Sequence, residues 1–235
     1  KTIGGTDNES LGNIQPTVDG GYVLGGSSQS NISGDKTENS RGVQDYWILK
    51  LDSLGNIEWQ NTIGGNNSDN LLSLQQTNDS GYILGGYSRS NISGDKTENV
   101  ISNDSINSDY DYWVLKLDAR GSIEWQNTIG GIDDDYLYSI KQSKDKNYIL
   151  GGYSSSNKSG DKTQDSKGEH DYWVIKLKEI GSIDSIKGNV FQARNNNCIQ
   201  ELNEAGVSRV ILQTEPKGFW SLTDSAGKFV ILVDT

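Results

Sequence analysis

Apolar and polar residues alternate along several short segments of this chain, and one such segment occurs three times. Its copies read DYWILKLD, DYWVLKLD and DYWVIKLK, and they occupy residues 45–52, 111–118 and 171–178. In the first copy, Trp47, Leu49 and Leu51 fall on one face of an extended strand, and Tyr46 and Ile48 fall on the other. Because both faces are apolar, we expect a strand that other layers cover on both sides.

Three further strands are predicted around each copy. A stretch of alternating residues, clearest at 72–77 and 138–143, comes before a run that ends in Gly-Gly, and a strand at 57–63 follows the first copy. The Gly-Gly pair indicates a close approach of two backbones that a side chain would block. The copies begin 66 and then 60 residues apart, and the difference falls in one polar loop, which we therefore place at the surface.

Residues 1–182 therefore form all-β repeats of four antiparallel strands, which is typical of β-propeller blades; the stacked sheets of a solenoid are the alternative. The third repeat lacks its fourth strand, because Ser185 stands where Trp59 and Trp125 stand in the others. Residues 2–3 match the end of such a strand. Three blades are too few to close a ring. We expect a partial propeller that further blades upstream, or other copies of the chain, complete.

The repeat resembles the β-propeller repeats of secreted, Bacteroidota-type surface proteins. The resemblance rests on the runs GYILGG, DYWVLKLD and GSIEWQNTIGG, and it covers residues 1–182 three times over. It implies a rigid scaffold, export by the type IX pathway, and a role in adhesion or surface assembly.

Residues 183–235 depart from the repeat and are predicted to form a small, incomplete β-sandwich. Short runs rich in β-branched and aromatic residues occur at 186–191, 208–213, 219–223 and 228–233, separated by Gly, Pro and Asp. The run Val190-Phe191 and the hairpin-like run at 223–229 resemble the immunoglobulin-like repeats of bacterial surface adhesins. This resemblance implies a stalk-like domain with a calcium loop.

The loop after Phe191 is compared with a twelve-residue calcium loop, which needs oxygen ligands at its positions 1, 3, 5, 7, 9 and 12. Position 1 is Ala193, which has no side-chain oxygen, and Cys198 replaces the glycine that usually makes the bend. A turn held by asparagine side chains is the alternative. The candidate calcium ligands are Asn195, Asn197, the Ile199 carbonyl, Glu201 and Glu204.

Composition narrows the possible partners. The net charge of −11 argues against nucleic acid and anionic membranes, which bind clustered Lys and Arg. No apolar run approaches the roughly 20 residues of a membrane-spanning helix. The 11 Tyr and 6 Trp argue against disorder, and the single Cys198 cannot form an internal disulfide. Because the chain has no Met and starts at Lys1, we expect it to be a processed or trimmed piece.

Catalysis is not expected. The acidic turns, such as 133–135, differ between copies, whereas a glycosidase needs one carboxylate pair in a fixed arrangement. Asp35, Asp95 and Asp161 are expected to accept backbone amides as part of structural loops, the strand tryptophans to pack in the core, and His170 to be an ordinary loop residue.

We therefore expect a non-enzymatic, secreted or cell-surface scaffold or adhesion protein, whose partners are other surface proteins, glycans or copies of itself. One alternative is a glycan-binding or carbohydrate-processing module that uses loop residues such as Tyr87 and Asp95. The other is a self-assembling surface filament subunit.

Overall fold

The computed structural model describes the whole chain except residues 103–108, 180–183, 190–210, 214–219, 223–227 and 234–235. It divides into two compact units, Lys1–Lys178 and Glu179–Thr235. Every regular element among the described residues is a β-strand, so the all-β prediction is confirmed.

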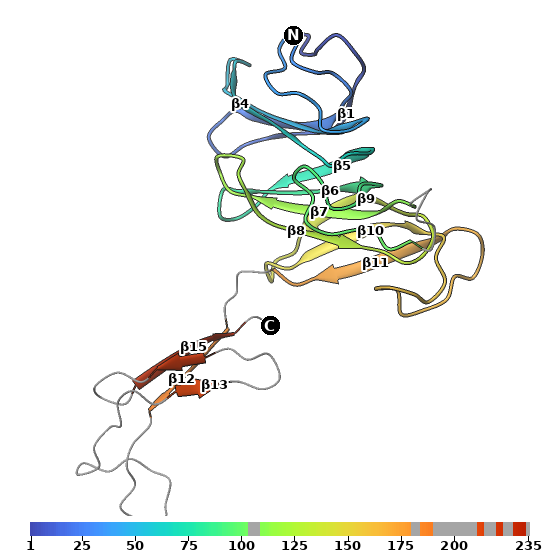
Figure 1. The fold of residues 1–235 in the computed structure, drawn as a ribbon. Helices are drawn as coiled ribbons and strands as arrows, with labels where there is room; N and C mark the ends of the chain where they lie inside the picture. The colour runs from blue at the N-terminus through green and yellow to red at the C-terminus, as the bar shows by residue number, and fades with distance from the viewer. Residues whose placement is uncertain (103–108, 180–183, 190–210, 214–219, 223–227, 234–235) are drawn as a thin grey trace, which may run out of the picture. The chain divides into compact units, whose positions relative to one another are not determined.

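Three antiparallel sheets make up the first unit, and each corresponds to one sequence repeat (Figure 1). Sheet 1 contains β1 (Glu9–Pro16), β2 (Tyr22–Ser28), β3 (Asp45–Leu51) and β4 (Ile57–Ile63). Sheet 2 contains β5 (Asp69–Gln76), β6 (Tyr82–Ser88), β7 (Asp111–Leu117) and β8 (Ile123–Ile129). Sheet 3 contains β9 (Asp135–Gln142), β10 (Tyr148–Ser154) and β11 (Asp171–Leu177). The strands of each sheet follow one another in chain order.

A repeated turn joins the first two strands of each sheet. In sheet 1, the Gly20 amide donates to the Thr17 carbonyl at 2.9 Å, and Asp19 accepts hydrogen bonds from the Thr17 hydroxyl and the Gly21 amide. Gly20 has a φ of 85°, a conformation that glycine adopts without steric cost. Ser80 and Lys146 occupy the same place in the other two sheets with φ of 68°, so the turn forms there with a strained residue.

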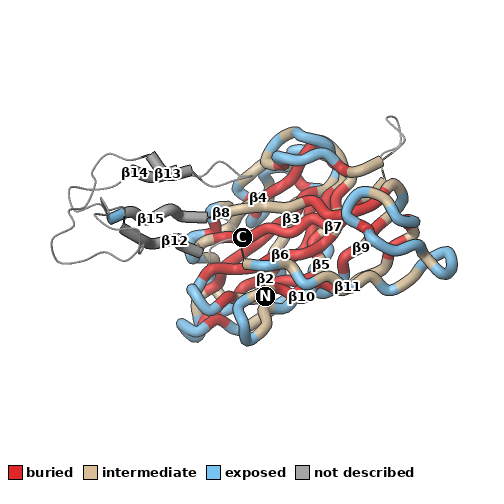
Figure 2. The backbone as a smooth tube through the Cα atoms, turned by 90° about the horizontal axis from the view of Figure 1, so that it is seen from below, coloured by how far each residue is buried: buried red, intermediate tan, exposed pale blue. Residues whose placement is uncertain are grey.

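The sheets are stacked face to face, with apolar residues between them. Between sheets 1 and 2, Tyr46 and Ile48 of β3 pack in one buried cluster with Trp113 of β7. Tyr112 and Val114 of β7 repeat this arrangement against sheet 3. The strands β3 and β7 are buried along their whole length, as predicted for strands that are apolar on both faces (Figure 2).

The Gly-Gly pairs allow the strands to approach closely, as the sequence predicts. A Cβ on Gly26 would lie 2.0 Å from the Ser10 carbonyl oxygen, and one on Gly86 would lie 1.9 Å from that of Asn70. The preceding glycine faces the next sheet, since a Cβ on Gly85 would lie 2.8 Å from the Leu137 side chain.

Sheet 3 differs from the other two sheets. It has three strands, and β11 pairs with β10 alone among the described residues. The prediction that this strand is covered on both faces is wrong for β11, because no described sheet packs on its outer side. Tyr172 is 96% exposed there and Val174 is 68% exposed.

The second unit contains two antiparallel pairs of strands among its described residues, β12 with β15 and β13 with β14. No helix in the described ranges is long and apolar enough to cross a membrane. The candidate calcium ligands Asn195, Asn197, Ile199, Glu201 and Glu204, together with Ala193, lie outside the described residues. The strands are β12 (Asp184–Asn189), β13 (Ile211–Gln213), β14 (Trp220–Leu222) and β15 (Lys228–Val233).

Candidate functional site

The long polar loop of each repeat clamps the end of a preceding strand segment. Asp95 accepts the Gly64 amide at 3.1 Å, and its own amide donates to the Gly64 carbonyl at 2.9 Å. Asp161 holds Gly130 in the same way. The prediction that these loop aspartates accept backbone amides is confirmed, and their carboxylates have a structural role.

A lysine from the same loop is buried between strands, which the sequence analysis did not anticipate. Lys96 is 2% exposed, and its Nζ donates to Thr128 Oγ1 at 2.6 Å and lies 4.9 Å from the centre of the Trp113 ring. Lys36 makes the equivalent bond to Thr62 at 2.7 Å. Burial lowers the pKa of Lys96 to about 8, because the charged ammonium loses its hydration.

A pair of aspartates is buried at each contact between sheets. Asp45 and Asp69 belong to the first contact, Asp111 and Asp135 to the second, and all four are 0% exposed. One oxygen of each accepts a backbone amide; Asp69 accepts that of Gly65 and Asp135 that of Gly131, both at 2.7 Å. The other oxygen, Oδ1, has no hydrogen-bond partner among the described residues.

Burial changes the acidity of these aspartates. Desolvation, together with a smaller effect of the second carboxylate of each pair, raises the pKa of Asp69 to about 6 and that of Asp111 to about 8. Asp171 occupies the Asp111 position in sheet 3, where the pKa of its carboxylate is lowered by the amides of Lys167 and Gly168. The opposite shifts show that the contact between sheets, rather than the local motif, determines the protonation of this position.

These carboxylate pairs are buried and repeated. Each pair recurs at equivalent positions in both contacts, and its members lie in the packed interior, where a substrate would have no access. The described part of the chain contains no cluster of three His, Cys, Asp or Glu side chains that could hold a metal ion. Their geometry fits a role in holding loops and adjacent sheets together.

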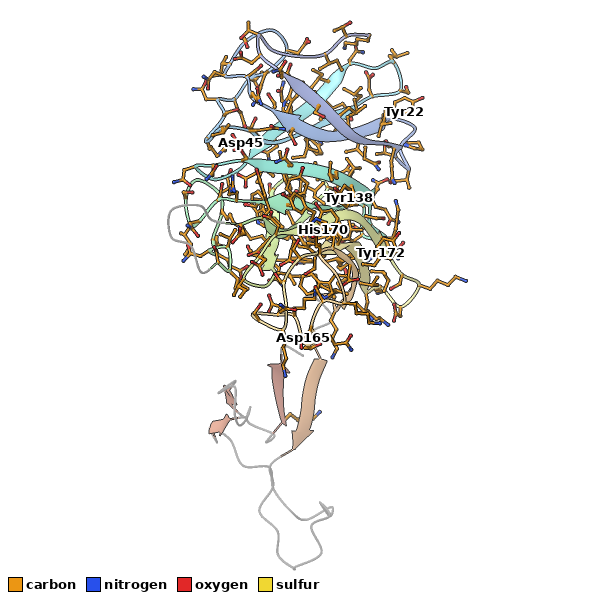
Figure 3. The ribbon with its side chains drawn as sticks, turned by 90° about the vertical axis from the view of Figure 1, so that its right-hand side faces the viewer. Tyr22, Asp45, Tyr138, Asp165, His170 and Tyr172 are labelled. Atoms are coloured by element: carbon orange, nitrogen blue, oxygen red, sulfur yellow. The ribbon has the colours of Figure 1, made fainter. Side chains whose placement is uncertain are left out.

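A half-exposed group of aromatic side chains lies along one side of sheets 2 and 3, and we call it the tyrosine cluster. Neighbouring ring centres are 4.6 Å apart for Tyr87 and Tyr136 and 5.0 Å apart for Tyr136 and Tyr153. Figure 3 labels two of its members, Tyr138 and His170, which both border Tyr153. The members of the cluster are Tyr87, Tyr110, Tyr136, Tyr138, Tyr153 and His170.

Burial makes three phenols of the cluster harder to ionise. Desolvation raises the pKa of Tyr87, Tyr136 and Tyr153, and the neighbouring phenols raise it further. Tyr138 is 52% exposed, so part of the cluster faces solvent. Flat, neutral, partly exposed rings with hydroxyl groups can stack on sugar rings and form hydrogen bonds with them.

The residues named for a possible glycan site lie in different environments. Tyr87 belongs to the tyrosine cluster, whereas Asp95 forms an ion pair with Arg41 at 2.6 Å in the contact between sheets 1 and 2. His170 borders the cluster, and its Nδ1 lies 2.8 Å from Ser155 Oγ. The cluster was not predicted from the sequence, because its members come from different strands and loops. The only sequence signal for it is the large number of tyrosines in repeats 2 and 3.

No protein-family model matches this chain. The regulatory protein FlaEY of Caulobacter vibrioides is 24% identical to it over 184 residues, which is 77% of the chain. The chain spans only 18% of the length of that relative.

Proposed function

We propose that the three sheets are blades of a β-propeller. The first strands of successive sheets contact each other directly, as the inner strands of blades do around a central axis. A Cβ on Gly12 of β1 would lie 2.3 Å from the Leu71 carbonyl of β5, and Ser73 of β5 accepts the Ile140 amide of β9 at 3.1 Å. These contacts between first strands support a radial arrangement over a linear stack.

The propeller would act as a non-enzymatic scaffold or adhesion module of a secreted or cell-surface protein. The observation that carries this proposal is that the repeated carboxylates and lysines are used in structural contacts. Asp35, Asp95 and Asp161 accept glycine amides, and the four buried aspartates accept backbone amides of adjacent loops. Export by the type IX pathway and a stalk-like, immunoglobulin-like tail belong to the same proposal.

The test has two arms. Particles coated with the chain should adhere to a cell or matrix surface, and a panel of glycoside and ester substrates should remain unchanged. A hydrolase activity that disappears on Asp111→Asn or Asp135→Asn, in a variant that is still folded, would refute the scaffold role.

Glycan binding at the tyrosine cluster is the second candidate function, and the half-exposed rings of Tyr138 and Tyr153 favour it. A glycan array should then give saturable binding to particular sugars that Tyr138→Ala weakens. Tyr22→Ala is the matched control, because Tyr22 is also partly exposed, at 42%, but lies in sheet 1 away from the cluster. A flat response across the array would reject this function.

We also propose that the tail loop of the second unit binds calcium. Calcium should raise the unfolding temperature of the second unit, and Glu204→Gln should reduce that shift. Equal unfolding temperatures in calcium and in a chelator would reject the site.

A further inference from the structure

The first residues of the chain lie on sheet 1 as the end of an outer strand lies on the sheet that follows it. Gly4 donates its amide to Asp35 at 3.1 Å, as Gly64 at the end of β4 donates to Asp95 of sheet 2. The Lys1 ammonium donates to the Gly55 carbonyl at 2.6 Å. One repeat further along, the Asn61 side chain of β4 makes the equivalent bond to the Gly121 carbonyl of the next repeat at 2.7 Å. Residues 1–5 therefore take the position of a fourth strand that belongs to a neighbouring sheet.

Within the described part of the chain, no strand pairs with the free edge of β11 in sheet 3. In sheets 1 and 2 the third strand pairs with a fourth, with Trp47 opposite Thr62 and Trp113 opposite Thr128. The same register places Thr2 opposite Trp173 of β11. The buried lysine that reaches the threonine in the other sheets is Lys162 here, and it donates instead to Ser154, Ser156 and Ser166.

The outer faces of sheets 1 and 3 are the two halves of a contact that already occurs twice. Tyr46 donates its hydroxyl to the Trp113 carbonyl, and Tyr112 donates to that of Trp173, both at 3.1 Å. Tyr172 is the next tyrosine in this series, and it is 96% exposed. The Trp47 carbonyl is the corresponding acceptor on sheet 1.

The surface beside Trp47 has room for the incoming ring. A cavity of about 210 Å³ lies there, lined by Ile3, Leu11 and Leu24 among others. On sheet 3, a Cβ added to Gly151 would meet nothing within 4 Å, whereas the equivalent Gly85 contacts Leu137 and Ile140 of the next sheet. Both faces therefore lack the neighbour that their counterparts have inside the stack.

Charge also favours the pairing of these two faces. At the contact between sheets 1 and 2, Arg41 forms an ion pair with Asp95 at 2.6 Å. Lys167 occupies the Arg41 position in repeat 3, because each donates its amide to the aspartate that begins the third strand. Asp35 occupies the Asp95 position in repeat 1. Stacking sheet 3 on a sheet 1 would bring opposite charges together.

We propose that sheet 3 binds sheet 1 of a second copy of this chain, whose residues 1–5 add to β11 as its fourth strand. Between two copies of the 235-residue chain, two such contacts of sheet 3 with sheet 1 form a ring of six sheets, within the range of about four to eight blades found in propellers. This inference rests on the repeated sheet contacts and on the proposed propeller arrangement. It does not rest on the scaffold or adhesion role, so the two can fail separately.

Sedimentation of the 235-residue chain over a range of concentrations tests the proposal. A dimer should form, and Val174→Lys should weaken it by about tenfold or more, which corresponds to about 1.4 kcal/mol. Ile92→Lys is the matched control, because Ile92 is 61% exposed away from both faces and repeat 3 carries Lys158 at that position. A monomer at the highest soluble concentration would overturn the proposal.

Directed crosslinking tests the register. One preparation carries Lys1→Cys and the other Val174→Cys, each with Cys198→Ser, since Ile48 and Asn61 pair at the equivalent place in sheet 1. Mixing them under mild oxidation should give a disulfide-linked heterodimer, whereas Ile92→Cys in place of Val174→Cys should not. A dimer that lacks this crosslink would mean that a different surface associates, and the proposed contact would be wrong.

Discussion

Asp111 provides the sharpest test of how the contacts between sheets control this protein. Its carboxyl is 0% exposed, and desolvation raises its pKa from the ordinary value of 3.8 to about 8. The folded protein therefore retains a proton that the unfolded chain releases above about pH 4. Stability from this group is complete at low pH and is lost as the pH rises toward 8.

The size of this loss of stability follows from the difference between the pKa of Asp111 in the folded protein and its ordinary value. Each pH unit between the two pKa values is worth about 1.4 kcal/mol, so Asp111 accounts for about 4 kcal/mol of the stability lost between pH 5 and pH 8. The pKa values of Asp45, Asp69, Asp95 and Asp135 are also raised, so they add to the loss in the same direction. Lys96, whose pKa is lowered to about 8, begins to titrate at the upper end of this range and acts in the opposite direction, because the folded protein releases its proton before the unfolded chain does.

Asp111→Asn removes the charge and leaves an oxygen that can accept the Ile101 amide, which lies 2.5 Å from the carboxylate. Urea unfolding followed by tryptophan fluorescence at pH 5, 6, 7 and 8 should show a clearly smaller loss of stability in the variant. Asp171→Asn is the control, because the pKa of Asp171 is lowered and its titration falls below this range. Identical pH profiles for Asp111→Asn and the unaltered chain would refute the reasoning.

Three further substitutions test separate contacts. Tyr46→Phe removes only a hydroxyl that donates to a carbonyl of the next sheet, and urea unfolding should show a loss of about 1–2 kcal/mol; no loss would mean that this bond does not hold the sheets together. Gly85→Ala should cost about 1–3 kcal/mol by overpacking, while Gly151→Ala at the open face of sheet 3 should be nearly neutral in the monomer; equal effects would contradict the stacking. Burial raises the pKa of Asp79, but its hydrogen bond and ion pair with Lys116, at 2.8 Å, lower it to about 2. Lys116→Met should therefore raise the pKa of Asp79 in an NMR titration, and an unchanged pKa would show that the ion pair is absent in solution.

Most of the local structure could be predicted from the sequence. Alternating apolar residues predicted the strands, because one residue in two faces the same side of a strand. The number of such segments in each repeat predicted how many strands each sheet contains. The predicted fourth strand at 57–63 coincides with β4, and sheet 3 has three strands within the described part of the chain. The Gly-Gly pairs predicted close backbone contacts for a steric reason that is independent of the rest of the fold.

Tertiary structure alone decided which repeated residues share an environment. Tyr46, Tyr112 and Tyr172 have the same local sequence, yet the first two are buried and Tyr172 is exposed, because burial depends on whether another sheet is present. For the same reason, the pKa of Asp111 is raised and that of Asp171 is lowered. A repeat determines its own strands, whereas the burial and the acidity of its residues are determined by the neighbouring sheet.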